Sequence, residues 1–144
     1  MMNELEITPA EWRVMRIVWS KKAVTSSQVI EFLAPLMDWK DATVKTLLRR
    51  LVEKGALTAT KQGRAFIYRP AVEEQATIDQ AVENLFSGIC QMRAGDALIH
   101  AMKQVPLSKN DVHALQALLA EKAKAAPEQV PCNCLPGDEM CNCD

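Results

Sequence analysis

Apolar residues recur every three or four positions in two stretches near the start of the chain, and this spacing predicts two amphipathic helices. The first begins at Thr8-Pro-Ala-Glu11, where a threonine can cap the helix, a proline suits its first position and a glutamate can bond back to the cap. The second repeats this start signal as Thr25-Ser-Ser-Gln28. The first helix is expected to bury Trp12, Met15, Val18 and Trp19, and the apolar residues of the second are Val29, Phe32 and Leu33.

A third amphipathic helix is predicted within the stretch WKDATVKTLLRRLVEKGAL, residues 39–57. Its apolar face consists of Val44, Leu47, Leu48, Leu51 and Val52. At about 100° per residue, the opposite face consists of Ala42, Lys45, Thr46, Arg49, Arg50 and Glu53. Asp41 is a candidate N-cap, and Gly55 lies where a left-handed residue would end the helix.

Two β-prone runs follow this helix and flank a turn that contains Gly63, which predicts a hairpin with Lys61 and Arg64 at its tip. Three short helices followed by a basic-tipped hairpin form a winged helix-turn-helix with a two-stranded wing, here residues 1–70. In this fold the third helix, with its cationic and threonine-bearing face, can enter the major groove of DNA. The other interpretation is an ordinary amphipathic helix with a solvated basic face.

The distribution of charge favours DNA binding. The net charge of the whole chain is only −1, but residues 40–69 contain eight lysines and arginines against Asp41 and Glu53, a net charge of +6. Residues 1–39 carry a net charge of −1 and residues 70–144 carry −6. The basic segment coincides with the predicted third helix and wing, as expected of a surface that contacts phosphates.

Beyond the hairpin the apolar pattern predicts three more helices, so the fold class is mainly α. They extend over residues 73–86, over residues 90–105 and onward from a capping signal at Ser108-Lys-Asn-Asp111. Such short helices cannot bury their apolar faces alone, so they pack either on the winged helix or on a second copy of themselves. We expect a homodimer held by residues 71–124, because a winged helix has its own core and operators are usually read by symmetric pairs.

The end of the chain, residues 125–144, is predicted to be a linker and a metal-binding tail. The tail contains two Cys-x-Cys pairs, Cys132 with Cys134 and Cys141 with Cys143. In an extended segment residues i and i+2 point to the same side, so each pair can present two sulfurs to one ion. Soft thiolates select Zn²⁺, Cu⁺ and related ions. The fifth cysteine, Cys90, lies in an apolar helical run and is interpreted as a buried small hydrophobic residue.

The sequence lacks the signals of secretion, membrane insertion and catalysis. Its start has neither the basic region nor the apolar run of a secretory signal, and no window is long enough to span a bilayer. We therefore expect a cytoplasmic protein without a membrane partner, in which the cysteines remain reduced. His100 and His113 lie in helical runs without an adjacent nucleophile or carboxylate pair, which favours surface or interface roles and a protein that is not an enzyme.

Three motifs make the chain resemble the penicillinase-repressor (BlaI/MecI/CopY) family. They are T-P-A-E-W-x-V-M-x-x-x-W at residues 8–19, W-K-x-x-T-V-K-T-L-L-x-R-L-x-x-K-G-x-L at residues 39–57 and G-R-x-F-x-Y-x-P at residues 63–70. The cysteine pairs of the tail resemble those of the copper-responsive CopY branch. The familiar motif there is C-x-C-x4-C-x-C, whereas six residues, 135–140, separate the pairs in this chain.

The resemblance implies a dimeric repressor of copper-homeostasis genes that binds a palindromic operator through an N-terminal winged helix. It implies a zinc-loaded tail in the DNA-binding form and release when Cu⁺ replaces the zinc. The residues carried over to DNA binding are Thr43, Lys45, Thr46, Arg50, Gly63 and Arg64, and the helical pattern adds Arg49. The metal ligands carried over are Cys132, Cys134, Cys141 and Cys143. Expected partners are double-stranded operator DNA, a second copy of the chain, and metal ions that a copper chaperone can deliver.

Two other functions fit parts of this pattern. A repressor of the same family that responds to β-lactams shares the DNA-binding half, but it does not need a thiolate tail. A thiolate metal chaperone that binds no DNA uses the cysteine pairs, but it does not need a segment of net charge +6 centred on a helix-turn-helix. The copper-responsive repressor accounts for both features.

Overall fold

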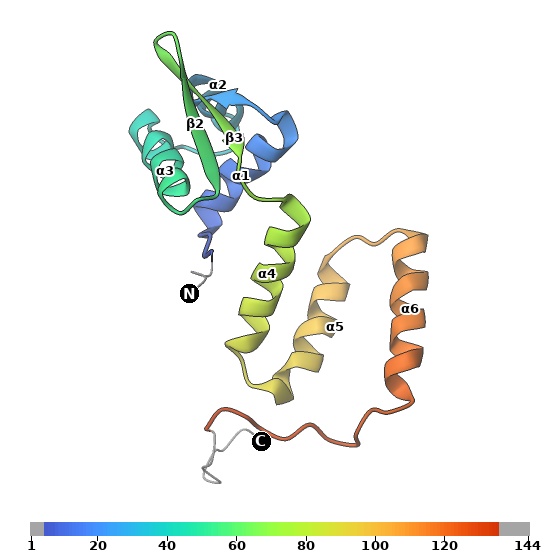
Figure 1. The fold of residues 1–144 in the computed structure, drawn as a ribbon. Helices are drawn as coiled ribbons and strands as arrows, with labels where there is room; N and C mark the ends of the chain where they lie inside the picture. The colour runs from blue at the N-terminus through green and yellow to red at the C-terminus, as the bar shows by residue number, and fades with distance from the viewer. Residues whose placement is uncertain (1–4, 136–144) are drawn as a thin grey trace. The chain divides into compact units, whose positions relative to one another are not determined.

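The computed structural model describes residues 5–135 of the 144-residue chain (Figure 1). Helices predominate over one small antiparallel sheet, which confirms the predicted mainly α, winged-helix class. None of the described helices has the length and apolar character needed to cross a bilayer. The chain divides after Ala81 into two compact units. The boundaries predicted for the DNA-binding domain at residue 70 and for the dimerisation region at residue 124 stay predictions.

The first two helices begin at the expected signals. They are α1 (Pro9–Lys21) and α2 (Ser26–Leu33). At α1 the Glu11 amide donates to Thr8 Oγ1 over 3.2 Å, and the Thr8 amide donates to Glu11 Oε1 over 2.9 Å. Thr25 and Gln28 form the same reciprocal pair at α2. Both capping boxes therefore form as predicted, because each satisfies amide groups that the first helical turn leaves without partners.

The third helix, α3 (Asp41–Glu53), ends as expected, but it begins at the residue predicted as its cap, one residue earlier than expected. Lys40 occupies the N-cap position and Asp41 is the first helical residue, so the prediction of Asp41 as N-cap was wrong. Gly55 follows the helix with φ +85°, and its amide donates to Val52 O while the Ala56 amide donates to Leu51 O. This is a Schellman ending, in which glycine is favoured because an L side chain strains the left-handed conformation.

The sheet contains the predicted hairpin and a third strand that the pattern did not reveal. The strands are β1 (Val24–Thr25), β2 (Leu57–Gln62) and β3 (Ala65–Pro70), arranged antiparallel in the order β1-β3-β2. Gln62 pairs with Ala65, which leaves Gly63 and Arg64 as a two-residue turn. Strand β1 pairs with β3 through Val24–Tyr68 and Thr25–Ile67. Two residues are too few to show an alternating pattern, so β1 could not be predicted from the sequence.

The core of the first unit lies between the three helices and the sheet. Its buried apolar residues are Val14, Met15, Val18, Val24, Val29, Leu33, Val44, Leu47, Leu48, Leu51, Ala56 and Leu57. Met15 and Val18 are buried as predicted, but Trp12 and Trp19 are only half-buried. The two indole rings contact each other with centroids 5.8 Å apart, and Trp19 Nε1 donates to Val72 O over 3.0 Å. A polar indole nitrogen favours such a position at the margin of the core.

An ion pair joins the start of α1 to the end of α3. Lys54 Nζ lies 2.6 Å from Glu11 Oε1 and also donates to the carbonyl oxygen of Glu6 over 2.7 Å. Glu11 is 1% exposed, whereas the Lys54 side chain is 33% exposed. Burial raises the pKa of Glu11, but the hydrogen bonds from Lys54 and Thr8 outweigh it and hold the pKa below its ordinary value. The pair therefore fixes α3 against α1 while Glu11 is ionised.

The remaining helices are α4 (Glu74–Ser87), the short 3₁₀ helix η1 (Gln91–Arg93), α5 (Ala94–Gln104) and α6 (Lys109–Ala123). The predicted cap of α6 forms, because the Ser108 and Asp111 amides each bond to the other residue's side chain over 3.0 Å. Over their whole length α5 and α6 contain no buried residue. Four of their large apolar side chains, Leu98, Ile99, Leu118 and Leu119, are each more than half exposed.

Candidate DNA-binding face and cysteine cluster

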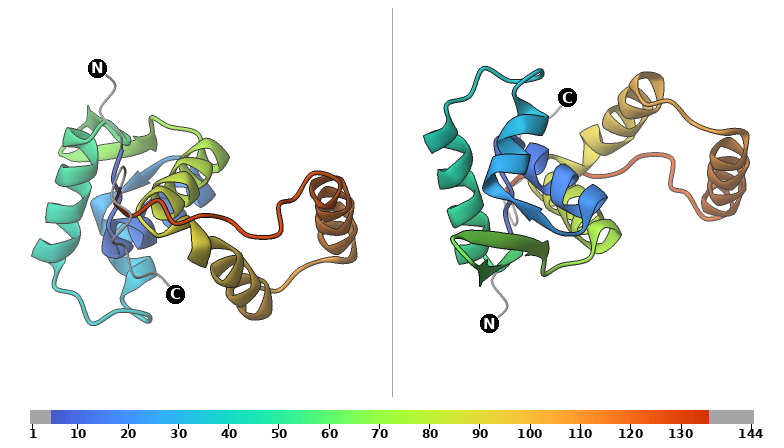
Figure 2. Two further views of the ribbon diagram at one scale, coloured as in Figure 1. Left: turned by 90° about the horizontal axis from the view of Figure 1, so that it is seen from below. Right: turned by 90° about the horizontal axis from the view of Figure 1, so that it is seen from above.

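The outer face of α3 carries the predicted DNA-binding residues of the helix. Thr43, Lys45, Arg49 and Arg50 are exposed and Thr46 is half-buried, while the apolar residues of the same helix face the core. Both views of Figure 2 show α3 along the outer edge of the first unit. An α-helix about 10–12 Å in diameter fits a major groove about 12 Å wide. The cationic face of α3 is therefore accessible to a duplex.

Contacts within α3 determine which groups of Thr46 and Arg49 are available to bind DNA. Thr46 Oγ1 donates to the Ala42 carbonyl oxygen over 2.9 Å, so its hydroxyl is left as an acceptor beside its methyl group. Arg49 Nε lies 3.8 Å from Glu53 Oε1 in a pair whose side chains are more than 60% exposed, a contact that a phosphate can readily replace. Within residues 5–135, Lys45 and Arg50 form no hydrogen bond or ion pair through their side chains.

The wing extends beyond the helices of its unit (Figure 1). Gly63 has φ +64° at the first position of the turn, whereas Arg64 does not have a positive φ, as in a type II′ turn. A Cβ atom on Gly63 would meet nothing within 4 Å, so backbone conformation and not lack of space favours glycine here. The turn leaves Lys61 and Arg64 exposed at the tip, where they can contact the phosphate backbone.

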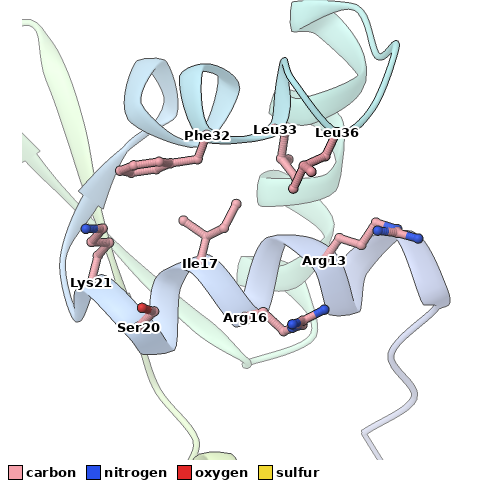
Figure 3. A pocket seen from close by; sticks show the side chains of 8 residues that line it. All are labelled: Arg13, Arg16, Ile17, Ser20, Lys21, Phe32, Leu33 and Leu36. Atoms are coloured by element: carbon pink, nitrogen blue, oxygen red, sulfur yellow. The ribbon is translucent and has the colours of Figure 1, made fainter. Parts of the chain in front are cut away.

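A separate cleft of about 360 Å³ lies between α1 and α2 (Figure 3). Its lining residues are Arg13, Arg16, Ile17, Ser20, Lys21, Phe32, Leu33 and Leu36. Lys21 Nζ lies 5.0 Å from the centroid of the Phe32 ring, which is a cation–π contact. None of the predicted DNA-binding residues lines this cleft, so it is distinct from the outer face of α3.

In the second unit, Cys132 and Cys134 come together with Cys90. The three Sγ atoms all lie within 4.8 Å of one another, and Cys90 Sγ is 3.6 Å from Cys132 Sγ. The Cys134 amide donates to Cys132 Sγ over 3.3 Å. The other predicted ligands, Cys141 and Cys143, lie outside the described residues.

Hydrogen bonds hold the end of the described chain beside Cys90. The Gln91 amide donates to Asn133 Oδ1 over 3.0 Å, and Gln91 Nε2 donates to the Pro131 carbonyl oxygen. Cys90 itself is half-buried, so the prediction of a buried small hydrophobic residue was wrong. Its position beside Cys132 was missed, although an odd cysteine in a chain whose others form pairs is a signal that could have drawn attention to it.

The spacing of the sulfurs fits a thiophilic metal ion. Two thiolates on one tetrahedral Zn²⁺, with Zn–S bonds of about 2.3 Å, lie about 3.8 Å apart. The 3.6 Å between the sulfurs of Cys90 and Cys132 is close to that value. The cluster that the described residues form consists of three thiol groups, and soft thiolates favour Zn²⁺ or Cu⁺ over Mg²⁺ and Ca²⁺.

In the first unit α2 and α3 form a helix-turn-helix, α3 presents a cationic face, and a basic wing follows. This arrangement defines a winged-helix DNA-binding protein. Over residues 7–121 the sequence matches the penicillinase-repressor family. The chain belongs to this family of transcriptional repressors.

Individual relatives show how far the similarity extends. The chain is 46% identical over 142 residues to an uncharacterized 16.5 kDa protein of the ptsI 3′ region of Latilactobacillus sakei, covering 99% of this chain and 96% of that protein. It is 28% identical over 116 residues to the penicillinase repressor of Bacillus licheniformis, covering 81% of this chain and 91% of the relative. Among solved structures, the repressor CopR is 41% identical, with 47% of this chain and 99% of that chain covered and a TM-score of 0.42.

Proposed function

We propose that this protein is a copper-responsive transcriptional repressor that binds a palindromic operator as a homodimer. In the DNA-binding form its tail thiolates hold Zn²⁺, and occupation of the same thiolates by Cu⁺ releases the DNA. The observation that carries this proposal is that the sulfur atoms of Cys132 and Cys134 lie within 4.8 Å of each other, in a chain that belongs to a repressor family. The protein acts in the cytoplasm and is not an enzyme.

The DNA-binding half of the proposal rests on a division of labour between α3 and the wing. Thr46 can accept a hydrogen bond from the amino group of adenine or cytosine, or place its methyl group against that of thymine. Lys45, Arg49 and Arg50 supply positive charge along the groove, and Thr43 of the same helix is also exposed. Arg64, in the turn formed by Gly63, contacts phosphate and carries no sequence information.

The dimer half rests on the apolar surface of α5 and α6. A helix with no buried residue in a single chain leaves its leucines in water, and contiguous exposed apolar surface typically marks an interface. A second copy of the same unit can cover these residues around a two-fold axis. A palindromic operator then places one α3 in each half-site.

The metal response rests on the chemistry of the thiolates. Four thiolates around one Zn²⁺ form a closed site of net charge −2. Cu⁺ is softer and accepts fewer thiolates per ion, so the same sulfurs adopt a differently shaped cluster around it. Because a ligand shifts a conformational balance only through its different affinity for the two states, this difference in shape is what drives release.

The test is metal analysis of the anaerobically purified full chain, followed by operator binding before and after addition of Cu⁺. The operator is first selected from random duplexes by the zinc-loaded protein. We expect about one Zn²⁺ per tail, tight salt-dependent binding, and release by Cu⁺ but not by further Zn²⁺. Binding that is indifferent to Cu⁺ but lost on proteolysis of the repressor favours the β-lactam-type relative. A protein that binds metal and no duplex at low salt is a chaperone.

A double variant, Cys132→Ser with Cys134→Ser, separates the tail from the winged helix. It is expected to keep its helical content and to bind duplex, but to remain on the operator when Cu⁺ is added. The matched control is Ala125→Ser with Ala126→Ser, which introduces two serines at exposed positions after α6 and removes no thiol. Normal copper-triggered release from the cysteine variant would rule out Cys132 and Cys134 as the sensor.

Variants of Thr46 and Arg64 test the two kinds of DNA contact. Thr46→Val removes the hydroxyl and keeps the shape, whereas Thr46→Ser removes the methyl group and keeps the hydroxyl. The variant that removes the base contact relaxes sequence preference by about 1–3 kcal/mol at one base position. Arg64→Ala is expected to weaken all duplexes alike and to reduce the salt slope by about one unit. Equal, sequence-independent losses from all three variants would contradict the division of labour.

A further inference from the structure

Cys90 lies in the short segment between the end of α4 at Ser87 and the start of η1 at Gln91. The two cysteines beside it, Cys132 and Cys134, come from the far end of the described chain. The sequence separation between Cys90 and Cys132 is 42 residues, and α5 and α6 lie entirely within it. The cluster therefore closes a loop that contains both exposed helices.

The approach of these segments does not depend on sulfur alone. Gln91, next to Cys90, bonds to Asn133 and to the Pro131 carbonyl oxygen, on either side of Cys132. These bonds align the segment so that three sulfurs converge within 4.8 Å. A cluster of soft donors that is already assembled binds a thiophilic ion with less loss of conformational entropy than three thiols on a free tail.

We propose that Cys90 is a thiolate ligand of the metal centre together with Cys132 and Cys134, and that the bound ion is a soft cation such as Cu⁺ or Zn²⁺. Cys90 then supplies one of the four thiolates of a tetrahedral Zn²⁺ site, and these three residues leave one position for a fourth ligand. The proposal rests on the proposed function only in taking the tail cysteines to bind metal. It assigns to Cys90 a role that the Cys-x-Cys pattern of the tail does not contain. The metal centre then joins the tail to the junction of α4 and α5 in the same subunit.

This ligand set connects metal binding to the dimerisation helices. Closing a loop of 42 residues restricts α5 and α6 from both ends, because the ion fixes the segment before η1 against the segment after α6. A change in cluster shape between Zn²⁺ and Cu⁺ then moves the two ends of this loop relative to each other. A metal site formed by tail residues alone does not connect the two ends of this loop and cannot restrict α5 and α6 in this way.

Alkylation of the reduced full chain tests ligation at each cysteine separately. The protein is treated with iodoacetamide under nitrogen, with and without Zn²⁺ or Cu⁺, and the rate at each cysteine is followed by mass spectrometry. We expect metal to slow alkylation of Cys90 at least about tenfold, in parallel with Cys132 and Cys134. In the Cys132→Ser, Cys134→Ser variant the protection of Cys90 is expected to disappear.

The outcomes of this experiment separate the two proposals. Protection of Cys132 and Cys134 with an unchanged rate at Cys90 overturns the role of Cys90 and leaves the proposed metal response intact. Absence of protection at every cysteine overturns the metal response itself, and with it the role of Cys90. Parallel protection of all three supports both.

Measurement of Cu⁺ affinity distinguishes metal binding by Cys90 from shielding of Cys90 by a tail that metal has folded over it. We compare the parent with Cys90→Ser, Cys90→Ala and the neighbouring control Ile89→Val, using competition with a chromophoric Cu⁺ chelator. Both changes at Cys90 are expected to weaken Cu⁺ binding by at least about tenfold with unchanged helical content, since loss of even an outer-shell partner weakens metal binding by about 10–100-fold. Parent-like affinity in either Cys90 variant overturns the proposal. If only serine weakens binding, Cys90 has a packing role instead.

Discussion

The two units of this chain differ in how they bury apolar side chains, although leucine and alanine are abundant in both. In the first unit α1, α2, α3 and the sheet enclose a core whose residues include Val14, Val29 and Leu48, each fully buried. In the second unit α5 and α6 bury no residue at all, and Leu118 remains 56% exposed. The first unit completes its core within one chain, and the second presents an unsatisfied apolar surface.

The comparison also separates two kinds of functional surface. The cationic face of α3 is complete in a single subunit, because the core behind it and the Glu11–Lys54 ion pair fix the helix. The apolar faces of α5 and α6 gain a role only when another surface covers them. We therefore expect changes in the first unit to alter folding, and changes in the second to alter association.

Truncation is expected to have the largest effect. A fragment of residues 1–81 should unfold cooperatively and remain monomeric, while a fragment of residues 82–144 should have helical content that rises with protein concentration. A fragment ending at Pro70 should be less stable than the longer one, because it lacks Val72, which packs on the core and accepts the Trp19 hydrogen bond. Circular dichroism and sedimentation equilibrium provide the measurements. A dimeric fragment 1–81 would place the interface in the first unit.

A pair of leucine-to-alanine changes compares the units directly. Leu48→Ala removes a fully buried side chain and should lower the free energy of unfolding by about 2–5 kcal/mol. Leu118→Ala should leave the unfolding of the first unit unchanged but raise the dimer dissociation constant. All three tryptophans, Trp12, Trp19 and Trp39, belong to the first unit, so their fluorescence in urea reports that unit alone. Equal losses of stability would remove the distinction between the units.

Removal of the cation that faces Glu11 should have an intermediate effect. Lys54→Met is expected to destabilise the first unit by about 2–3 kcal/mol at pH 7, less than a fully buried pair because a third of the lysine side chain is exposed. Lys61→Met, at the exposed wing tip, controls for the loss of one positive charge. Urea unfolding followed by tryptophan fluorescence measures both. A parent-like Lys54→Met variant would show that the ion pair does not hold α3 in place.

The pH dependence of the same pair has a definite sign. The pKa of Glu11 is lower in the folded state, so its contribution to stability is complete above the unfolded pKa of about 4.3 and is lost as the pH falls through the folded value. The acid loss should be smaller in Glu11→Gln, which has no carboxyl to protonate. The penalty of Lys54→Met should shrink as the pH falls, because a protonated Glu11 does not need the lysine. Urea midpoints between pH 7 and pH 3 test these trends.

Loss of a helix cap is the smallest change expected to be measurable, and it can be made alike in both units. Thr8→Ala should lower the stability of the first unit by about 1 kcal/mol, because it removes one bond of a capping box that includes the buried Glu11. Ser108→Ala removes the same bond from the exposed start of α6 and should reduce helical content locally without shifting the tryptophan transition. A shift of that transition by Ser108→Ala would couple the two units in folding.

Much of the first unit could be predicted from residues that are close in sequence. The capping boxes at Thr8 and Thr25, the left-handed Gly55 and the hairpin turn at Gly63 all involve partners within a few positions. The apolar and cationic faces of α3 follow from the same local periodicity. The start of α3 was misplaced by one residue, because aspartate also stabilises the first turn of a helix and not only its N-cap position. Lys40 occupies the cap without a side-chain hydrogen bond, and Asp41 lies in the first turn.

By itself the sequence determined which helices form, which of their faces are apolar and where cationic and thiol groups are concentrated, because these properties depend on the order of neighbouring residues. Only the tertiary structure decided that β1 joins the sheet, that Glu11 meets Lys54 and that Cys90 lies beside Cys132. The last two contacts join residues 43 and 42 positions apart. Such contacts form only when packing brings distant segments together, and no local periodicity encodes which distant residues will meet.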